Sequence, residues 1–281
     1  MAPWSTRDIP SQKGRTAVVT GANSGLGFEA ALALAAAGCH VVIACRDRAK
    51  GEAAIKRILD IAPEADLRLA DLDLADLASV RNFAAEFSAG HQGLDILVNN
   101  AGVMAIPRRE TADGFEMQFG TNHLGHFALT GLLIDELTAR PGARVVSVSS
   151  EVARIGRISF DDLQSSRRYG KWTAYAQSKL ANQLFTLELD RRASSEGLVS
   201  VAAHPGYAST NLQGVGPRMS GSRIMQKVTD LENGRSVVVL IDDRLPRHPG
   251  RGIIIDLSHS ACRQLEFGKE RVAKVKLEVL H

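Results

Sequence analysis

Two side chains able to move a proton stand four residues apart in this sequence. Tyr175 and Lys179 are separated by Ala, Gln and Ser, and four residues make about one turn of an α-helix. On a helix, the phenol and the ammonium group therefore share one face. Because a nearby cation stabilises a phenolate, this spacing predicts that the pKa of Tyr175 falls from about 10 toward neutrality. A tyrosine of that kind can serve as a general acid or base.

A Tyr-x-x-x-Lys pattern alone occurs often by chance and usually indicates an exposed helix pair, so other motifs have to decide between the two interpretations. A run of β-branched residues at 16–20 leads into a loop with glycines at Gly21, Gly25 and Gly27, and an apolar helical stretch follows at once. Glycines at such a turn let the backbone approach a pyrophosphate, whose charge then faces a helix N-terminus. The loop therefore predicts dinucleotide binding, although glycines at a strand-to-helix turn also occur for structural reasons alone.

Short β-branched runs alternate with Ala- and Leu-rich stretches of helical length along most of the chain. The expected strands are residues 16–20, 40–44, 67–70, 96–99, 145–149 and 199–203, with a weaker seventh at 252–255. The expected helices are residues 26–37, 49–61, 77–89, 114–139 and 173–195. This alternation predicts an α/β fold with a single doubly wound parallel sheet of Rossmann type and helices on both faces. We expect one domain over residues 1–281, with an irregular N-terminal arm at 1–13.

The composition of the chain indicates which kinds of partner it can bind and in which cellular compartment it is expected. The chain has 34 Lys and Arg against 31 Asp and Glu, a formal net charge of +3 with the basic residues scattered, which argues against nucleic acid. Cys39, Cys45 and Cys262 are too few for a disulfide framework, which favours a reducing cytoplasm. No secretory signal or membrane-spanning stretch is predicted. His123 and His126 have no third ligand nearby, so we expect packing or capping there and no metal.

The Thr-Gly-x-x-x-Gly-x-Gly pattern that begins at Thr20 resembles the short-chain dehydrogenase/reductase family. Five further motifs follow in that family's order, and the resemblance covers about residues 14–230. They are Asn99-Asn100-Ala101-Gly102, Asn122, Ser149-Ser150, Tyr175 to Lys179, and Pro205-Gly206. The resemblance implies hydride transfer between a nicotinamide cofactor and a carbonyl or alcohol.

The same resemblance implies a role for each candidate site residue. Tyr175 is the expected acid or base, and Lys179 lowers its pKa and binds the nicotinamide ribose. Ser150 is expected to hydrogen-bond the substrate oxygen, with Ser149 as a rival, and Asn122 to hold a water that connects Lys179 to solvent. The expected cofactor-binding residues are Gly21, Asn23, Ser24, Gly25, Leu26, Gly27, Arg46, Asp73, Leu74, Asn99, Ala101, Gly102, Tyr175, Lys179, Pro205, Gly206 and Thr210.

The end of the second expected strand bears on the choice between the two nicotinamide cofactors. An acidic residue there accepts hydrogen bonds from a ribose in NAD sites, whereas a 2′-phosphate needs a cation. Arg46 offers such a cation and Ser24 adds a hydroxyl, which favours NADP(H) over NAD(H). The alternative uses Asp47 as the ribose acceptor and leaves Arg46 in solvent.

Twenty-four residues separate Ser150 from Tyr175, which is long for this family. The segment at 151–172 resembles the branch that contains retinol dehydrogenases and light-dependent protochlorophyllide reductases, and both handle bulky hydrophobic molecules. It contains Arg154, Arg157, Phe160, Arg167, Arg168, Tyr169 and Trp172. We expect Tyr169 and Trp172 to line an apolar mouth with the arginines at its rim, a solvated basic loop being the alternative. A substrate lid is expected at 207–230.

From residue 231 to 281 the sequence departs from the family pattern. This departure puts in doubt the last strand, the back of the substrate pocket and any homo-oligomer interface built from them. The predicted function is therefore an NADP(H)-dependent oxidoreductase acting on a hydrophobic carbonyl or alcohol. The alternative is a weakly active or inactive NADP(H)-binding sensor, and light-driven reduction of a tetrapyrrole would need a bound pigment.

Overall fold

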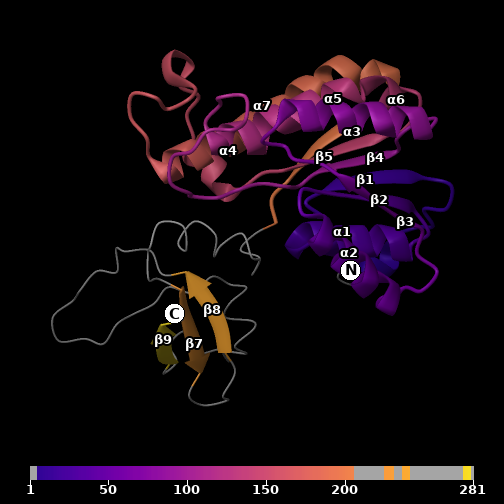
Figure 1. Cartoon of the computed structure of the whole chain (residues 1–281), viewed down its shortest axis with the longest axis horizontal. Helices are drawn as coiled ribbons and strands as arrows, with labels where there is room; N and C mark the ends of the chain where they lie inside the picture. Colours follow the sequence, from indigo (N-terminus) through magenta and orange to yellow (C-terminus); the bar gives the residue numbers. More distant parts are fainter. Residues whose placement is uncertain (1–4, 206–224, 231–235, 241–274, 280–281) are drawn as a thin grey trace. The chain divides into compact units, whose positions relative to one another are not determined.

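The structure is a computed structural model that describes residues 5–205 in full and the strands at 225–230, 236–240 and 275–279 (Figure 1). It divides into two compact units, Met1–Gly206 and Tyr207–His281. The first unit carries every predicted site residue except Thr210. The prediction of one domain over 1–281 stays a prediction, since most of the second unit lies outside the described residues.

The first unit is built on one six-stranded parallel sheet in the order β3-β2-β1-β4-β5-β6. This is the strand order of the doubly wound dinucleotide-binding fold, so the predicted fold class is confirmed. The strands are β1 (Thr16–Thr20), β2 (His40–Cys45), β3 (Leu67–Asp71), β4 (Ile96–Asn99), β5 (Arg144–Val148) and β6 (Val199–Ala203). Each lies within one or two residues of its predicted bounds.

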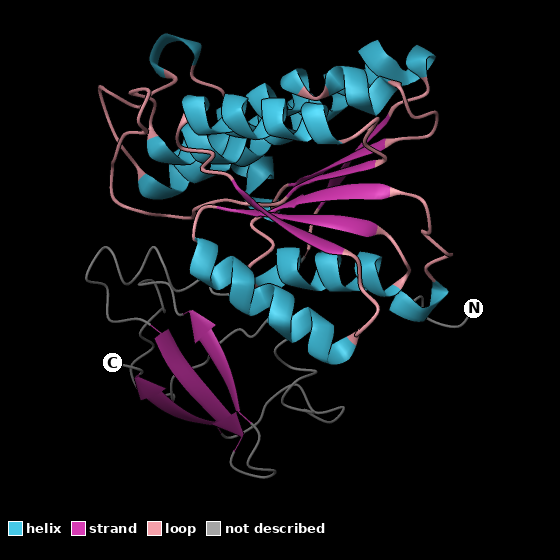
Figure 2. Ribbon diagram, turned by 45° about the vertical axis from the view of Figure 1, so that its right-hand side comes forward, coloured by secondary structure: helices cyan, strands magenta, loops and turns pink. Residues whose placement is uncertain are grey.

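Helices cover both faces of this sheet, as Figure 1 and Figure 2 show. One face carries α1 (Gly25–Ala36) and α2 (Arg48–Ile61). The other face carries α3 (Leu77–Gly90), α5 (Gly125–Leu132), α6 (Ile134–Thr138) and α7 (Lys171–Ala193). Short segments complete the unit: the 3-10 helices at Thr6–Asp8, Glu151–Ile155, Phe160–Asp162 and Ser194–Glu196, α4 (Met117–Phe119), and a π-helical segment at Gly120–Leu124.

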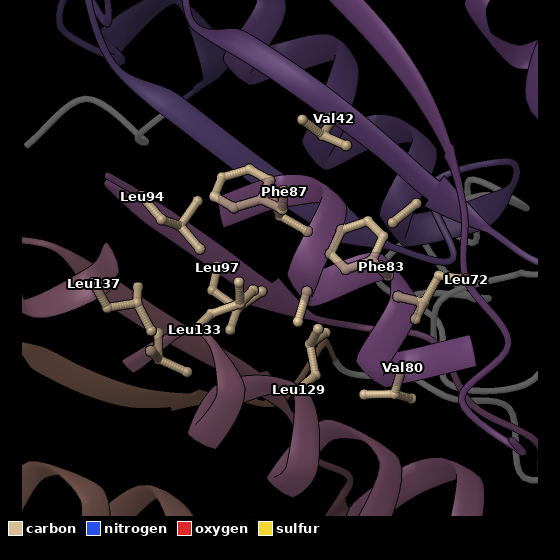
Figure 3. Close-up of a cluster of buried hydrophobic side chains, with 14 of the residues drawn as sticks. Val42, Leu72, Val80, Phe83, Phe87, Leu94, Leu97, Leu129, Leu133 and Leu137 are labelled. Atoms are coloured by element: carbon tan, nitrogen blue, oxygen red, sulfur yellow. The ribbon is translucent and has the colours of Figure 1, made fainter. Parts of the chain in front are cut away.

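Two apolar layers hold the helices against the sheet. On the α3 and α5 side, Phe83 and Phe87 pack with Leu97, Leu129 and Leu133, all at most 3% exposed (Figure 3). On the other side, strand residues of β1, β2 and β4 pack against α1 and α2. Because helices cover both faces, the interior residues of the central strands, 17–19 in β1 and 96–98 in β4, are apolar on both faces and do not alternate with polar residues.

The single long helix predicted at 114–139 is wrong. Gly114 has φ +82°, and Glu116 caps a new start by accepting hydrogen bonds from the backbone N–H groups of Gln118 (2.9 Å) and Phe119 (2.7 Å). The helix then passes through the π-helical segment and breaks again at Leu133, which has φ −104° and ψ 13°. A composition of good helix formers predicted continuity, whereas a buried capping carboxylate and tertiary packing fix the breaks.

The second unit contains one described sheet, in the order β8-β7-β9, with both pairings antiparallel. Its strands are β7 (Met225–Asp230), β8 (Ser236–Leu240) and β9 (Val275–Val279). The weak strand predicted at 252–255 lies outside the described residues. So does most of the lid predicted at 207–230, and its last six residues form β7.

Candidate active site

The glycine loop after β1 is closed so tightly that a side chain is excluded at Gly21 and at Gly27. A Cβ on Gly27 would lie 2.5 Å from Asn100 Nδ2 and 2.5 Å from the carbonyl oxygen of Gly21. Gly21 has φ +65°, and a Cβ there would lie 3.0 Å from Ala101 Cα. Ser24 occupies the N-cap of α1 without a side-chain capping bond. The start of α1 thus presents backbone N–H groups to an anion, as a pyrophosphate requires.

Asn23, Gly25 and Leu26 complete this loop and the first turn of α1. Gly25 has φ +57°, a left-handed conformation that glycine adopts without strain. The predicted cofactor loop is therefore formed as a strand-to-helix turn, with its open N–H groups at the carboxyl edge of the sheet. Contact of each residue with a cofactor stays a prediction.

Asn100, which sequence reasoning left out of the cofactor set, joins β4 to the glycine loop. Its Nδ2 donates to the carbonyl oxygen of Thr20 (2.8 Å), and the backbone N–H groups of Asn100 and Ala101 donate to Thr20 Oγ1 (2.9 and 3.0 Å). Asn99 is buried and donates to Thr130 Oγ1 (3.0 Å), so it ties the end of β4 to α5. The doubled asparagine in the sequence was the available signal.

The end of β2 separates the roles of its two charged residues. The Arg46 side chain is 69% exposed and lies 3.7 Å from an Asp73 carboxylate oxygen. Asp47 caps α2, accepting a hydrogen bond from the Lys50 backbone N–H (3.1 Å) and pairing with Lys50 Nζ (2.6 Å). These contacts with Lys50 hold the pKa of Asp47 below its ordinary value. The Asp47 carboxylate thus already has partners, whereas the Arg46 guanidinium reaches solvent.

Asp73 and Leu74, the predicted adenine contacts, follow β3. The Asp73 carboxylate accepts a hydrogen bond from the Ala75 backbone N–H (2.9 Å), and Leu74 is 5% exposed. Both therefore shape the turn after β3. Adenine contact stays a prediction for both residues.

Tyr175 and Lys179 lie one turn apart on α7, both nearly buried at 4% and 3% exposure. Lys179 Nζ lies 5.7 Å from the centre of the Tyr175 ring and donates a hydrogen bond to the carbonyl oxygen of Val148 at the end of β5 (2.8 Å). This carbonyl draws the ammonium toward the sheet. The one-face arrangement predicted from the spacing is thus the arrangement in the structure.

The pKa shifts run against the simplest expectation for this pair. Burial raises the pKa of the Tyr175 phenol, and a hydrogen bond with Ser150 lowers it in part. Burial lowers the pKa of Lys179 to about 8. In a site of low dielectric, the charged forms of both groups are disfavoured, and this desolvation outweighs the attraction that spacing alone suggests. The expected fall in the Tyr175 pKa is not found in this arrangement.

The two serines after β5 have different surroundings. Ser149 is 3% exposed, and its Oγ donates to the backbone carbonyl of Lys179 (3.0 Å). Ser150 makes no capping bond with its side chain, and its hydroxyl lies close enough to the Tyr175 phenol to lower the pKa of that group in part. Ser149 therefore anchors α7 to β5, and Ser150 is the serine whose hydroxyl is placed beside the phenol.

Asn122 lies in the π-helical segment and has no exposed surface. Its Oδ1 accepts from the Val103 backbone N–H (2.8 Å), and its Nδ2 donates to the Val103 carbonyl (2.9 Å) and to Ser178 Oγ (3.0 Å). Asn122 thus clamps the chain after β4 to the catalytic helix. The predicted water between Asn122 and Lys179 stays a prediction.

Short distances link this group to the cofactor loop. A Cβ on Gly102 would lie 2.8 Å from Asn122 Oδ1 and 3.9 Å from Lys179 Nζ, and the neighbouring Ala101 packs against Gly21. The glycine loop, the turn after β4 and the four polar residues therefore meet at the carboxyl edge of one sheet. Ligands of doubly wound folds bind at this edge.

Three buried polar residues of this site were missed by sequence reasoning as site residues. The Asn122 carbonyl accepts hydrogen bonds from Asn182 Nδ2 and His126 Nδ1, both at 3.0 Å, and Ser178 Oγ donates to the Tyr175 carbonyl (2.8 Å). The signal was present, since polar residues inside a helix that packs on a sheet require partners.

The two histidines on this helix have protein partners. His123 Nδ1 lies 3.2 Å from Asn182 Oδ1, and burial lowers the pKa of His123. Within the described parts of the chain, no group of three or more His, Cys, Asp and Glu is arranged to hold a metal ion. None of the described helices is long and apolar enough to cross a bilayer.

The 151–172 segment is tied to the body of the unit and its arginines are exposed. Gln177 on α7 bonds both the Ser159 N–H (2.9 Å) and the Leu163 carbonyl (3.0 Å). The Tyr169 hydroxyl donates to the Ile106 carbonyl (2.7 Å) and accepts from Gln118 Nε2 (2.8 Å). Burial raises the pKa of Tyr169 to about 12. The Tyr169 hydroxyl therefore holds the segment against Ile106 and Gln118. This is a structural role, different from the predicted lining of an apolar mouth.

Trp172 meets the expectation for an apolar wall better than Tyr169 does. Its indole packs edge-on against the Tyr175 ring, with 6.2 Å between ring centres, and is 36% exposed. Phe160 is 82% exposed and contributes no buried surface. Pro205 follows β6 at the surface, and the remaining two predicted cofactor residues, Gly206 and Thr210, lie outside the described residues.

A glycine loop and a Tyr-Lys-Ser-Asn group at one sheet edge, with Tyr175, Lys179 and Asn122 buried, define the class of dinucleotide-binding oxidoreductases. The sequence model of the short chain dehydrogenase family matches residues 15–218. The chain is 49% identical to human retinol dehydrogenase 12 over 199 residues, covering 71% of this chain and 63% of that protein. It is 50% identical to human retinol dehydrogenase 13 over 200 residues, covering 71% and 60%.

Comparison with solved structures supports the same class of protein. A crystal structure of an uncharacterized protein from Mycobacterium Paratuberculosis has 49% identity and a TM-score of 0.66, covering 77% of this chain and 78% of that one. The NADP complex of Pseudomonas aeruginosa RhlG has 28% identity and a TM-score of 0.59, covering 73% and 77%. The chain belongs to the short-chain dehydrogenase/reductase family, and it spans about 60% of the length of the retinol dehydrogenases that it matches.

Proposed function

We propose that this protein is an NADP(H)-dependent oxidoreductase that interconverts a carbonyl and an alcohol on a hydrophobic substrate. The observation that carries this proposal is the convergence of Tyr175, Ser150 and Lys179 with the glycine loop at one sheet edge. A family member that retains all of these groups has the means to orient a substrate and to transfer its proton.

Each residue has a distinct task in the proposed reaction. The bound nicotinamide supplies or accepts the hydride. The Tyr175 hydroxyl donates its proton to the carbonyl oxygen in reduction and takes one back in oxidation. The Ser150 hydroxyl bonds the same oxygen, where negative charge develops. Lys179 has N–H groups beyond the one given to Val148, and these are suited to ribose hydroxyls.

NADP(H) is the proposed cofactor because of the two charges after β2. Asp47 is committed to the start of α2, and Arg46 extends into solvent from the strand end where a ribose phosphate binds in this fold. The likeness to an NADP complex supports the same choice. A guanidinium offers a fork of donors that matches a phosphate.

The proposed substrate is an aldehyde, ketone or alcohol on a large apolar group. The relatives to which the chain is similar are named retinol dehydrogenases, and retinol is an alcohol on a large apolar group. In this chain, Trp172 offers an aromatic wall beside Tyr175. The cytoplasm is the proposed compartment, and the free buried thiols of Cys39 and Cys45 support a reducing one. Association into a homo-oligomer stays a prediction.

A second candidate is an NADP(H)-binding protein with little turnover. It is favoured by one observation, that the family match ends at residue 218 and does not include residues 219–281. The reacting groups would then bind the cofactor without completing a substrate site.

NADPH consumption by the full chain, measured against a panel of carbonyls, tests the proposal. The panel pairs all-trans-retinal and long-chain aldehydes with small polar ketones, and isothermal calorimetry measures the affinity for NADPH and NADH. We expect turnover that favours the apolar carbonyls and tighter binding of NADPH. NADPH binding without turnover of any carbonyl would establish the second candidate, and turnover of small polar ketones alone would contradict the substrate class.

A further inference from the structure

A buried histidine that takes no part in the proposed proton transfer lies between the cofactor loop and the catalytic group. His126 on α5 is 3% exposed. Its Nε2 lies 2.9 Å from Thr20 Oγ1, and Thr20 directly precedes the glycine loop. Its Nδ1 lies 3.0 Å from the carbonyl oxygen of Asn122. The imidazole therefore spans from β1 to the π-helical segment.

The partners of this ring fix its tautomer. A carbonyl oxygen only accepts hydrogen bonds, so Nδ1 carries the proton that bonds Asn122. Burial, with smaller contributions from the charges of Lys179 and His123, lowers the pKa of His126 to about 4. Near neutral pH the ring is therefore neutral, and its Nε2 accepts a hydrogen bond from the Thr20 hydroxyl.

The Asn122 carbonyl is held from two helices. Asn182 Nδ2 on α7 donates to it at 3.0 Å, at the same distance as His126 Nδ1 on α5. Side chains of two different helices thus donate to the same carbonyl oxygen. The side chain of the same residue bonds Val103 and Ser178, and Ser178 is the neighbour of Lys179. A shift of Asn122 would therefore reach the catalytic helix.

We propose that His126 is a positioning residue for the reaction, acting through the Asn122 carbonyl to fix the placement of Asn122 against α7. This inference rests on the proposed oxidoreductase function. The link to Thr20 orients the ring, and the bond to Asn122 carries its effect to the site.

The two ends of the link depend on His126 unequally. The Thr20 hydroxyl has a second acceptor in the Val98 carbonyl (3.2 Å) and also receives the backbone N–H groups of Asn100 and Ala101. The glycine loop thus keeps its support when the ring is lost. Of its two side-chain donors, the Asn122 carbonyl would keep only Asn182. Removal of the ring should therefore lower kcat and leave the affinity for NADPH nearly unchanged.

Three substitutions separate the two ends of the ring. His126→Leu removes both hydrogen bonds. His126→Asn keeps a donor near the place of Nδ1, and His126→Gln keeps an acceptor near the place of Nε2. His91→Leu is the matched control, because His91 Nδ1 also bonds the carbonyl four residues earlier, that of Phe87 (2.9 Å), and the residue lies beyond α3 away from the site.

The measurements are kcat and KM with an apolar aldehyde, the NADPH dissociation constant, and the thermal midpoint of each variant. We expect His126→Leu to lower kcat by about 10- to 100-fold, as a small misplacement of reacting groups does, with NADPH affinity within about threefold. His126→Asn should recover most of kcat and His126→Gln little. His91→Leu should lower the thermal midpoint without lowering kcat.

Two results would overturn the inference. One is a kcat for His126→Leu equal to that of the unchanged chain. The other is an equal loss for the Leu, Asn and Gln variants that tracks their thermal midpoints, since a purely structural histidine gives that pattern. An unchanged chain that turns over no carbonyl overturns the proposed function itself, and this outcome is distinguishable because it is seen before any substitution.

Discussion

The glycine loop and the catalytic helix meet at one sheet edge but are built on opposite principles. The loop works by leaving side chains out, since a Cβ on Gly27 would lie 2.5 Å from two neighbouring atoms. The catalytic layer works by burying polar side chains and pairing them, as Asn122 does with Val103 and Ser178. One region is fixed by steric exclusion and the other by hydrogen-bond satisfaction.

This contrast predicts different failures. A substitution in the loop should weaken cofactor binding because the backbone itself must move. A substitution among the buried polar groups should change turnover first, because each group orients another across a long stretch of sequence. Asn122 and Ser178 stand 56 residues apart, and Ser149 and the Lys179 carbonyl 30 apart. Substitutions in each region therefore test the comparison, and they are taken in order of expected effect.

The largest effect is expected from Tyr175→Phe. Loss of the phenolic proton should lower kcat by about 10²- to 10⁴-fold, with NADPH affinity within about twofold. Steady-state kinetics and calorimetry measure the two quantities. Tyr169→Phe is the matched control, since the Tyr169 hydroxyl bonds Ile106 and Gln118, so its removal should reduce stability and spare turnover. Undiminished turnover by the Tyr175 variant would assign the proton to another group.

The next effect separates the two serines after β5. Ser150→Ala should lower kcat by about 10²- to 10³-fold, as loss of a donor to a developing oxyanion does. Ser149→Ala removes the bond to the Lys179 carbonyl and should lower the free energy of unfolding by about 1 kcal/mol. Kinetics and urea unfolding of both variants give the comparison. The reverse pattern, with turnover lost only in Ser149→Ala, would make that serine the reacting one.

Local patterns predicted the sheet and the loop because their causes are local. The strand at 16–20 has its predicted bounds, since an apolar β-branched run between breakers has one good solution in a sheet covered on both faces. The glycines after it were found because tight turns restrict residue type at fixed offsets. The one-turn spacing of Tyr175 and Lys179 on a helix was correct for the same reason.

Tertiary contacts decided what the patterns missed. The break in the expected helix at 114–139 depends on Glu116, whose carboxylate caps the nearby N–H groups of Gln118 and Phe119 from a buried position that the local sequence does not reveal. The predicted fall in the pKa of Tyr175 was wrong because the spacing of Tyr175 and Lys179 gives no information on how deeply the phenol is buried. The roles of Asn100 and Asn182, and the contact of His126 with Thr20, come from partners far along the chain, which no local window contains.

Gly27→Ala tests the loop side of the comparison. Overpacking of this kind costs about 1–3 kcal/mol, and if the cost falls on the bound state, the NADPH dissociation constant should rise roughly 10- to 100-fold. Gly131→Ala on α5 is the matched control, because a Cβ there has no neighbour within 4 Å and alanine favours helix. Calorimetry of both variants measures the difference. Unchanged NADPH affinity for Gly27→Ala would show that the loop yields, contrary to steric exclusion.

The smallest effect is expected at Arg46, the charged side chain that we propose to bind the 2′-phosphate of NADPH. Arg46→Ala should weaken NADPH binding by about tenfold and leave NADH binding unchanged, because only NADPH carries the phosphate that a guanidinium holds. Arg48→Ala is the control, since Arg48 already pairs with Asp71 (3.3 Å) and Glu52 (3.3 Å). If Arg46→Ala weakens both cofactors equally, Arg46 supports the turn and not the phosphate. Tighter binding of NADH than of NADPH by the unchanged chain would instead indicate that Asp47 accepts hydrogen bonds from the ribose. The Asp47 side chain would then have to leave its capping position on α2 when the cofactor binds.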